Sequence, residues 1–151
     1  MTEITLSRLM GAGWTSERKI NIEVIEKVYK DKGIIMPDNV RSFFIEYGLL
    51  KISFDKTVLN ERIEEVIEFD PTKAIGDNYD SDYFLEIFDE YDIAEKVYPI
   101  GVANRGNLMV LMSENNNFYR YTDGFLCRDG GSTDEMLDCV VGECKEPVFI
   151  E

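Results

Sequence analysis

The periodicity of the apolar residues changes once along this chain, and that change limits the folds it can adopt. Before residue 48, apolar side chains recur at helical spacing, most regularly in Val40, Phe43, Phe44 and Tyr47, at positions i, i+3, i+4 and i+7. From residue 97 onward, short apolar runs alternate with turn residues instead. A run of helices followed by a meander of strands predicts an α+β domain with helices packed on one face of an antiparallel sheet.

The helical part divides into three short helices, each followed by glycine. The first covers residues 3–11, the second follows Asn21 and stops at Gly33, and the third runs from residue 38 to Gly48. The lone tryptophan, Trp14, lies between the first two. At 151 residues the chain has the length of one domain, and a domain of this size buries roughly 70% of the surface of its unfolded chain. We therefore expect residues 1–151 to form a single domain.

The predicted strands cover residues 49–54, 63–69, 97–103, 107–112, 118–122 and 125–128. Segment 63–69 fits a helix or a strand, and we favour a strand that is broken by Asp70-Pro71. Segment 107–112 is almost wholly apolar and is predicted to lie centrally in the sheet. A final helix covers residues 133–141, where Ser132 and Glu135 have the spacing of a capping box.

Acidic residues are concentrated in residues 61–95. This segment holds thirteen Asp or Glu against Arg62 and Lys73, a formal charge of −11 out of −14 for the whole chain. An acidic chain is a poor ligand for nucleic acid, whose phosphates require Lys and Arg. The excess favours a basic partner, a cation or simple solubility. We expect the first half of the segment to form an acidic sheet edge that discourages self-association.

The sequence carries little of the chemistry that enzymes use. It has no histidine, which excludes Ser-His and Cys-His nucleophilic pairs. Cys127, Cys139 and Cys144 have no zinc-ligand spacing, and an odd cysteine count fits a reduced, cytoplasmic protein. No phosphate-binding glycine loop, signal peptide or membrane-length apolar run occurs. We therefore expect no catalytic residues, no cofactor and no contact with membranes.

Residues 77–82 are the best candidate for a metal ligand set. Asp77, Asp80 and Asp82 with an amide oxygen from Asn78 suit Ca²⁺. The register of a calcium-binding EF-hand loop nevertheless fails, because Tyr83 stands where glycine is needed. We favour a solvated loop with an aspartate helix cap, and no metal site.

The acidic helix predicted over residues 81–92 has two interpretations. Phe84, Ile87, Phe88 and Tyr91 form its apolar face, so its acids form either a solvated surface or a negative patch for a basic partner. Mutual repulsion of so many acids is more than solubility requires, which favours a patch. The predicted partner-binding residues are Asp77, Tyr79, Asp80, Asp82, Tyr83, Glu86, Asp89, Glu90 and Asp92, with the two tyrosines as anchors.

Two groups of motifs resemble a known family. The first comprises Ala12-Gly13-Trp14 with Arg18, and the helix pattern that ends in Tyr47-Gly48-x-Leu50. The second comprises Phe69-Asp70-Pro71-Thr72, Tyr98-Pro99-Ile100-Gly101, the segment 106–109, Gly130-Gly131, and Leu137 with Gly142. Together they resemble the SUKH immunity proteins, in particular the third SUKH family. Trp14 and Phe43 are expected core anchors, and Gly13, Gly48, Gly101 and Gly131 are expected at turns.

The resemblance implies a curved antiparallel sheet with helices beside it. It also implies a cytoplasmic bacterial protein that binds and neutralises a cognate polymorphic toxin, commonly a nuclease or deaminase, without catalysis. We expect a monomer or weak homodimer whose acidic surface covers a basic face of the toxin. Two alternatives remain open: a regulatory scaffold that binds a host protein, and a divalent-cation-binding or hydrolytic protein that uses residues 77–82.

Overall fold

The structure, a computed structural model, describes residues 1–74 and 83–151, and of Tyr83 the backbone only. Within these ranges one antiparallel sheet of seven strands follows the chain in the order β1-β2-β3-β4-β5-β6-β7. The strands are β1 (Lys51–Val58), β2 (Glu61–Glu68), β3 (Val97–Ala103), β4 (Leu108–Ser113), β5 (Phe118–Thr122), β6 (Phe125–Gly130) and β7 (Val148–Phe149). The helices are α1 (Glu3–Gly11), α2 (Glu23–Asp31), α3 (Asp38–Tyr47), α4 (Pro71–Ala74), α5 (Tyr83–Glu90) and α6 (Thr133–Val140).

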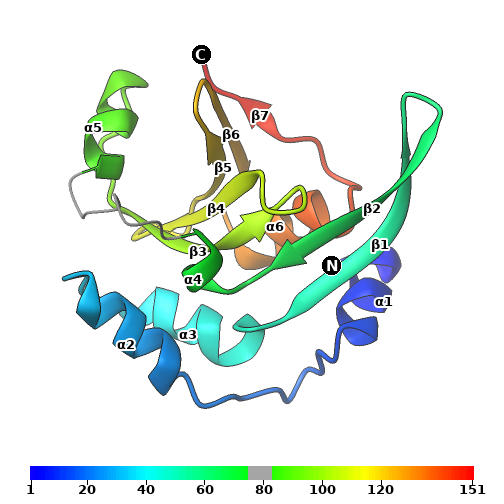
Figure 1. Cartoon of the computed structure of the whole chain (residues 1–151), viewed down its shortest axis with the longest axis horizontal. Coiled ribbons are helices and arrows are strands. Elements are labelled where there is room, and N and C mark those ends of the chain that lie inside the picture. Colours follow the sequence, from blue (N-terminus) through cyan, green and yellow to red (C-terminus); the bar gives the residue numbers. More distant parts are fainter. Residues whose placement is uncertain (75–82) are drawn as a thin grey trace.

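The sheet curls into a half-barrel, with α1, α2 and α3 on one side of the molecule and α5 on another (Figure 1). The predicted α+β class, the N-terminal helices, the curved sheet and the C-terminal helix are confirmed. Segment 63–69 is a strand, and β4 lies in the middle of the strand order, as its apolar composition predicts.

Side-chain hydrogen bonds explain where α1, α2 and α6 begin. The Thr2 hydroxyl accepts a hydrogen bond from the Thr5 amide at 3.3 Å, which caps α1. The Asn21 side chain accepts one from the Glu23 amide at 2.8 Å at the start of α2. At α6 the Ser132 hydroxyl accepts from the Glu135 amide at 3.2 Å. The Glu135 carboxylate reaches the Gly131 amide at 3.4 Å, so the predicted capping box is closed one residue early.

The sheet separates two apolar clusters. The larger cluster holds side chains of α1–α3 and α6 together with one face of the sheet, including Trp14 and Phe43, which are buried as predicted. The smaller cluster holds α5 and the opposite face of β4–β6. Along β4 the faces alternate, with Val110 in the larger cluster and Leu111 in the smaller one. The curled sheet therefore has helices packed on both faces, so the expectation of helices on one face only is wrong, and α5 has a cluster of its own.

Strands β1 and β2 form a hairpin, called the arm below, that extends away from the sheet (Figure 1). They pair from Lys51↔Glu68 to Val58↔Glu61, whereas β2 pairs with β3 only at Glu68↔Val102. The edge strand is β1, so the expectation that the first half of segment 61–95 forms the sheet edge is wrong, because β2 lies second in the strand order. The outer part of β2 nevertheless has β1 as its only partner strand among the described residues.

A glycine permits β2 and β3 to meet at that single point. Gly101 lies inside β3, not in the turn expected for it, and a Cβ there would clash with the Glu68 carbonyl oxygen. Gly13 does occupy a turn with φ +104°. The close approach at Gly101 fixes where the arm leaves the sheet.

Candidate functional site

Helix α5 is attached to the sheet by aromatic side chains on one face. The ring of Phe88 meets that of Tyr119 edge-on, with centroids 5.0 Å apart, and Phe84 meets Tyr121 at 6.1 Å. Phe84 and Phe88 are buried, and Ile87 packs against the same cluster. These are the apolar positions that the helical spacing predicts, so the opposite face of α5 is free for contact with solvent or a partner.

Acidic side chains occupy that opposite face. Glu86, Asp89 and Glu90 are exposed, as is Asp92, which follows the helix at φ 59°. Within the described residues none of the four has an ion-pair partner. Asp89 and Glu90 follow Glu86 at i+3 and i+4, so the three like charges repel one another along this face. Acids near the C-terminus of a helix also interact unfavourably with the helix dipole. The acidic face of α5 is therefore expected to destabilise the helix.

The segment after α5 is tied to the sheet through Glu95. Its carboxylate accepts hydrogen bonds from the Tyr119 hydroxyl, from Asn115 Nδ2 at 3.1 Å and from Asn117 Nδ2 at 3.2 Å. Burial opposes the ionisation of Glu95, but these hydrogen bonds and one from Ser113 outweigh it and hold its pKa below the ordinary value. Burial and the neighbouring carboxylate both raise the pKa of Tyr119. The ionised Glu95 thus anchors α5 to β4 and β5.

The acids of β2 differ from those of α5, because basic residues face several of them. Lys56 lies 3.6 Å from Glu65, and Lys51 lies 4.0 Å from Glu68. Arg62 is itself paired with Asp55 at 2.5 Å. Within the described part of segment 61–95, eight acids have no ion-pair partner, and four of them lie in α5 or directly after it; the others are Glu61, Glu64, Asp70 and Glu95.

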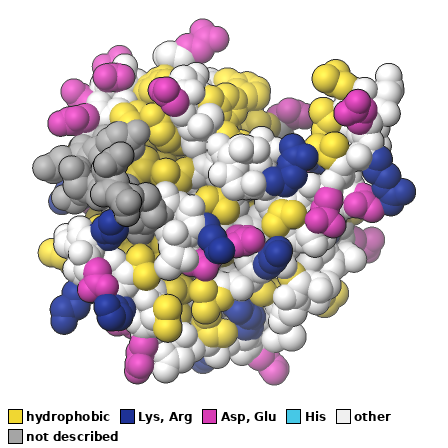
Figure 2. All heavy atoms as spheres, viewed as in Figure 1, with side chains coloured by type: hydrophobic (Ala, Val, Ile, Leu, Met, Phe, Trp, Pro, Cys, Tyr) yellow, Lys and Arg dark blue, Asp and Glu magenta, His cyan; other side chains and the backbone are white. Residues whose placement is uncertain are grey.

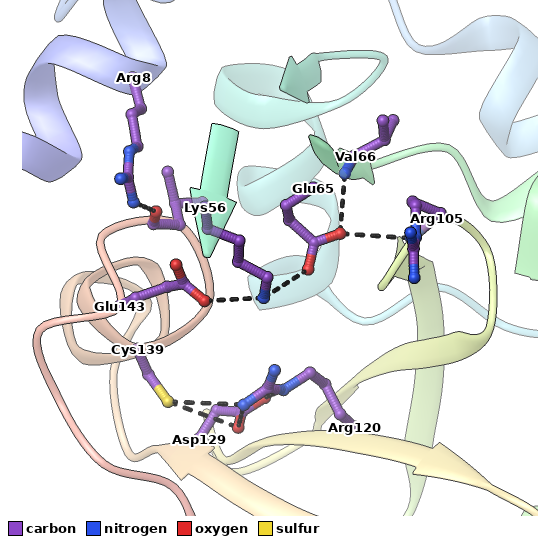
Figure 3. Close-up of polar contacts among 10 residues, drawn as sticks. Arg8, Lys56, Glu65, Val66, Arg105, Arg120, Asp129, Cys139 and Glu143 are labelled. Atoms are coloured by element: carbon purple, nitrogen blue, oxygen red, sulfur yellow. Dashed lines mark hydrogen bonds and ion pairs between the residues drawn. The ribbon is translucent and has the colours of Figure 1, made fainter. Parts of the chain in front are cut away.

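A buried polar cluster between α6 and the sheet is a second candidate site (Figure 3). Arg120 holds Asp129 with two hydrogen bonds of 2.9 Å, and the Cys127 and Cys139 thiols contact the same carboxylate at 3.4 and 3.6 Å. Burial and the Asp129 charge raise the pKa of Cys127 to about 11 and that of Cys139 to about 12. Both thiols are protonated at neutral pH, which makes them poor nucleophiles. The cluster joins α6 to β5 and β6 and offers no reactive group.

The described residues contain neither a metal-binding cluster nor a membrane-spanning helix. Neither range contains a group of three or more Cys, Asp or Glu side chains arranged to hold a metal ion. None of the helices described is long and apolar enough to span a membrane. The candidate metal loop, residues 77–82, falls outside the described residues.

Comparison with known families identifies the chain. A model of the SUKH-3 immunity protein family matches residues 1–143. The chain belongs to the SUKH-3 immunity protein family. No curated protein and no solved structure matches it. The resemblance seen in the motifs is thereby confirmed over most of the chain, and membership implies that a SUKH-3 protein of this kind has a cognate toxin as its partner.

The structure of this SUKH-3 protein describes only some of the predicted partner-binding residues. Glu86, Asp89, Glu90 and Asp92 are exposed on and after α5. Tyr83 begins α5, but its side chain is not described. The remaining predicted residues lie outside the described ranges: Asp77, Tyr79, Asp80 and Asp82. Their role in binding stays a prediction.

Periodicity along the chain does not indicate the large apolar side chains that are exposed on the arm, α5 and β7 of this SUKH-3 protein. In Figure 1, α5 and the outer end of the arm lie at opposite ends of the long axis, with β7 between them. Figure 2, from the same side, shows hydrophobic side chains between these two ends and others on the arm, with Asp and Glu beside them. Large apolar residues exposed on these elements are Val58, Leu59, Leu85, Val148 and Phe149. Exposed apolar residues beside charged ones are typical of protein-binding surfaces.

Proposed function

We propose that this SUKH-3 protein binds its cognate toxin through the acidic face of α5 and neutralises it by covering a basic surface, without catalysis of its own. The observation that supports this most is the set of four exposed acids, Glu86, Asp89, Glu90 and Asp92, without ion-pair partners among the described residues. A basic surface is what a nuclease presents to its nucleic-acid substrate. We therefore propose a nuclease domain as the toxin.

The family and the structure support a binding mechanism in different ways. The family implies the toxin partner, and the acids on α5 supply the charge that would attract a cationic protein over a distance of about 10 Å at physiological salt. Three free cysteines, of which Cys127 and Cys139 are buried, fit a reducing compartment. We propose that binding takes place in the cytoplasm of a bacterium.

A charge-reversal experiment tests the acidic face. The variant E86K/E90K is compared with E17K/E23K, which makes the same change in net charge at exposed positions on the side of α2. The binding partner is the C-terminal toxin domain encoded by the neighbouring open reading frame. We expect E86K/E90K to slow association about tenfold at low salt, with the difference shrinking as salt rises, because steering by exposed charges is screened.

The control separates a specific face from overall charge. E17K/E23K should associate at nearly the wild-type rate. Equal rates for both variants at every salt concentration would remove the acidic face from the proposal. The absence of any complex between the wild-type protein and the toxin domain would remove that toxin as the partner.

A further inference from the structure

Strand β1 leaves one edge of the sheet open. It is the first strand in the order, and its eight residues pair with β2 alone. Natural proteins shorten, cover or charge such an edge, because a row of unpaired amides and carbonyls can bind another strand. The charged residues of β1 are Lys51, Asp55 and Lys56, a formal charge of +1 from two lysines and one aspartate. The edge strand itself therefore lacks the negative charge that segment 61–95 concentrates.

Every second residue of β1 directs its backbone groups away from β2. The Phe69 amide donates to the Leu50 carbonyl oxygen at 3.0 Å, so Leu50 and the even-numbered residues after it face β2. The residues that face outward are Lys51, Ser53, Asp55 and Thr57. All four are exposed, and no described residue outside β2 makes a hydrogen bond to their backbone groups. The edge thus offers donors and acceptors to an incoming strand.

The side chains of the outward-facing residues form an exposed polar strip. The Lys51 and Asp55 side chains are 69% and 52% exposed, and Arg62 on β2 donates to Asp55 at 2.5 Å. Helix α1 contacts the other face of β1, where the Arg8 guanidinium lies 3.7 Å from the ring centroid of Phe54. Side chains alternate between the two faces of a strand, so this contact leaves the polar strip uncovered.

Lys56 does not guard the edge, although an inward-pointing charge on an edge strand often does. It lies 2.9 Å from Glu143, which follows α6, and 3.6 Å from Glu65 on β2 (Figure 3). Glu65 is buried and accepts hydrogen bonds from the amides of Val66 at 2.7 Å and Arg105 at 3.2 Å. The Lys56 charge is therefore matched within the protein, and these contacts hold the arm against α6 and the β3–β4 turn.

The spacing of the remaining charges fits a second copy of this chain. In an antiparallel pair of β1 strands whose two-fold axis passes through Ser53, Lys51 of each copy lies opposite Asp55 of the other. Outward-facing residues meet outward-facing residues in this register, so each such pair can exchange two backbone hydrogen bonds. Opposite charges directly across two strands stabilise their pairing. An axis through Asp55 would instead place two carboxylates together.

We propose that β1 is a self-association edge, at which two copies of this chain pair antiparallel about Ser53 and join their sheets. The proposal does not depend on the toxin, and α5 lies at the opposite end of the long axis from the outer end of the arm (Figure 1). A contact between two strands is small for an interface, and each copy carries a formal charge of −14. We therefore expect a reversible dimer that forms at high protein concentration and strengthens with added salt.

A charge swap tests the register, with sedimentation equilibrium of the full chain as the measurement. D55K and K51D each place like charges opposite one another, whereas K51D/D55K restores opposite charges. We expect each single variant to weaken association about tenfold and the double variant to recover most of the loss. The matched control for D55K is E17K, which makes the same change in net charge at an exposed position before α2. Because a lower net charge reduces repulsion, E17K should associate at least as tightly as the wild type.

S53P tests the backbone pairing. Proline removes an outward-facing amide that no described residue outside β2 uses, and proline is tolerated on edge strands where the N–H faces solvent. We expect S53P to lose the dimer while its melting temperature stays near that of the wild-type monomer. If S53P melts much lower, the charge swap alone decides.

Four outcomes would overturn the proposal. The first is a wild-type protein that remains monomeric up to about 1 mM at high salt, since even weak dimers form there. The second is a double variant that associates no better than D55K and K51D. The third is a dimer that a stably folded S53P leaves unchanged, which would assign the contact to another surface. The fourth is a monomer whose binding of the toxin domain weakens in S53P, which would assign the edge to the toxin.

Discussion

At the scale of single residues, Asp129 is the carboxylate most dependent on its partners. Its side chain is fully buried, Arg120 binds both of its oxygens at 2.9 Å, and two thiols contact it. The variant D129N removes the charge and leaves the Arg120 guanidinium in a mostly buried site. Because an unpaired buried charge is costly, we expect D129N to lose about 3–5 kcal/mol of unfolding free energy. Urea unfolding measures this loss.

A double replacement distinguishes the pair from the space that it fills. R120M/D129L removes both charges while keeping apolar volume, and buried ion pairs replaced in this way are often close to neutral. We expect the double variant to be clearly more stable than D129N. Equal instability of the two would mean that packing, not the unpaired charge, governs the loss.

Single-residue predictions from the sequence succeeded where periodicity decides burial. Trp14 and Phe43 are buried as expected, because each lies on an apolar face or beside one. The Arg120–Asp129 pair could not be predicted, since it depends on the pairing of β5 with β6. Register decides which side of a sheet every side chain faces, and a single sequence fixes it poorly.

At the scale of elements, the tie between α5 and the sheet should depend on pH through Glu95. The pKa of Glu95 is depressed in the folded state, so Glu95 stabilises the fold at pH values above its ordinary pKa of 4.5. That stabilisation is lost as the pH falls through the pKa of the folded state. We expect E95Q to be about 1–2 kcal/mol less stable than wild type at pH 7, a figure reduced for its partial exposure. The difference should shrink below pH 4, as measured by urea unfolding.

Two further observations would check that explanation. Y119F removes one donor to Glu95 and should show a smaller loss than E95Q at pH 7. Hydrogen exchange should quicken in α5 before it quickens in β4, because α5 is the element that Glu95 anchors. A stability difference that stays constant from pH 7 to pH 3 would contradict the role of the charged carboxylate.

The elements that sequence reasoning missed are the shortest ones. Helix α4 was predicted as a break at Asp70-Pro71, yet Asp70 accepts from the Thr72 amide at 2.9 Å and Pro71 occupies the first helical position, where proline is favoured. Asp70 and Pro71 are thus a helix start, whereas the sequence analysis treats them only as the end of a strand. Strand β7 has two residues, Val148–Phe149, too few for any periodicity to show.

At the scale of the whole molecule, the pairing of the strands decides which exposed residues lie near one another. The helical spacing of residues 84–91 predicts the exposed acids of α5 correctly. It does not show where the arm points, because that direction depends on the single point at which β2 pairs with β3 (Figure 1). The acidic face of α5 was therefore predictable, and the position of the exposed apolar residues on the arm was not.

The net charge leads to a prediction about stability that also bears on function. Thirty acids against sixteen bases repel one another in the folded state, and salt weakens that repulsion. We expect the melting temperature to rise when NaCl is raised from about 20 mM to about 300 mM, conditions under which the Debye length falls from about 20 Å to about 6 Å. E86K/E90K, with a formal charge of −14 + 4 = −10, should melt higher than wild type at low salt and gain less from added salt. The same variant is expected to bind its toxin more slowly, so its added stability would mean that the α5 acids are kept for recognition at the expense of folding. If E86K/E90K melts lower than wild type at low salt, the α5 acids stabilise the fold, and the case for a binding face must then rest on association kinetics alone.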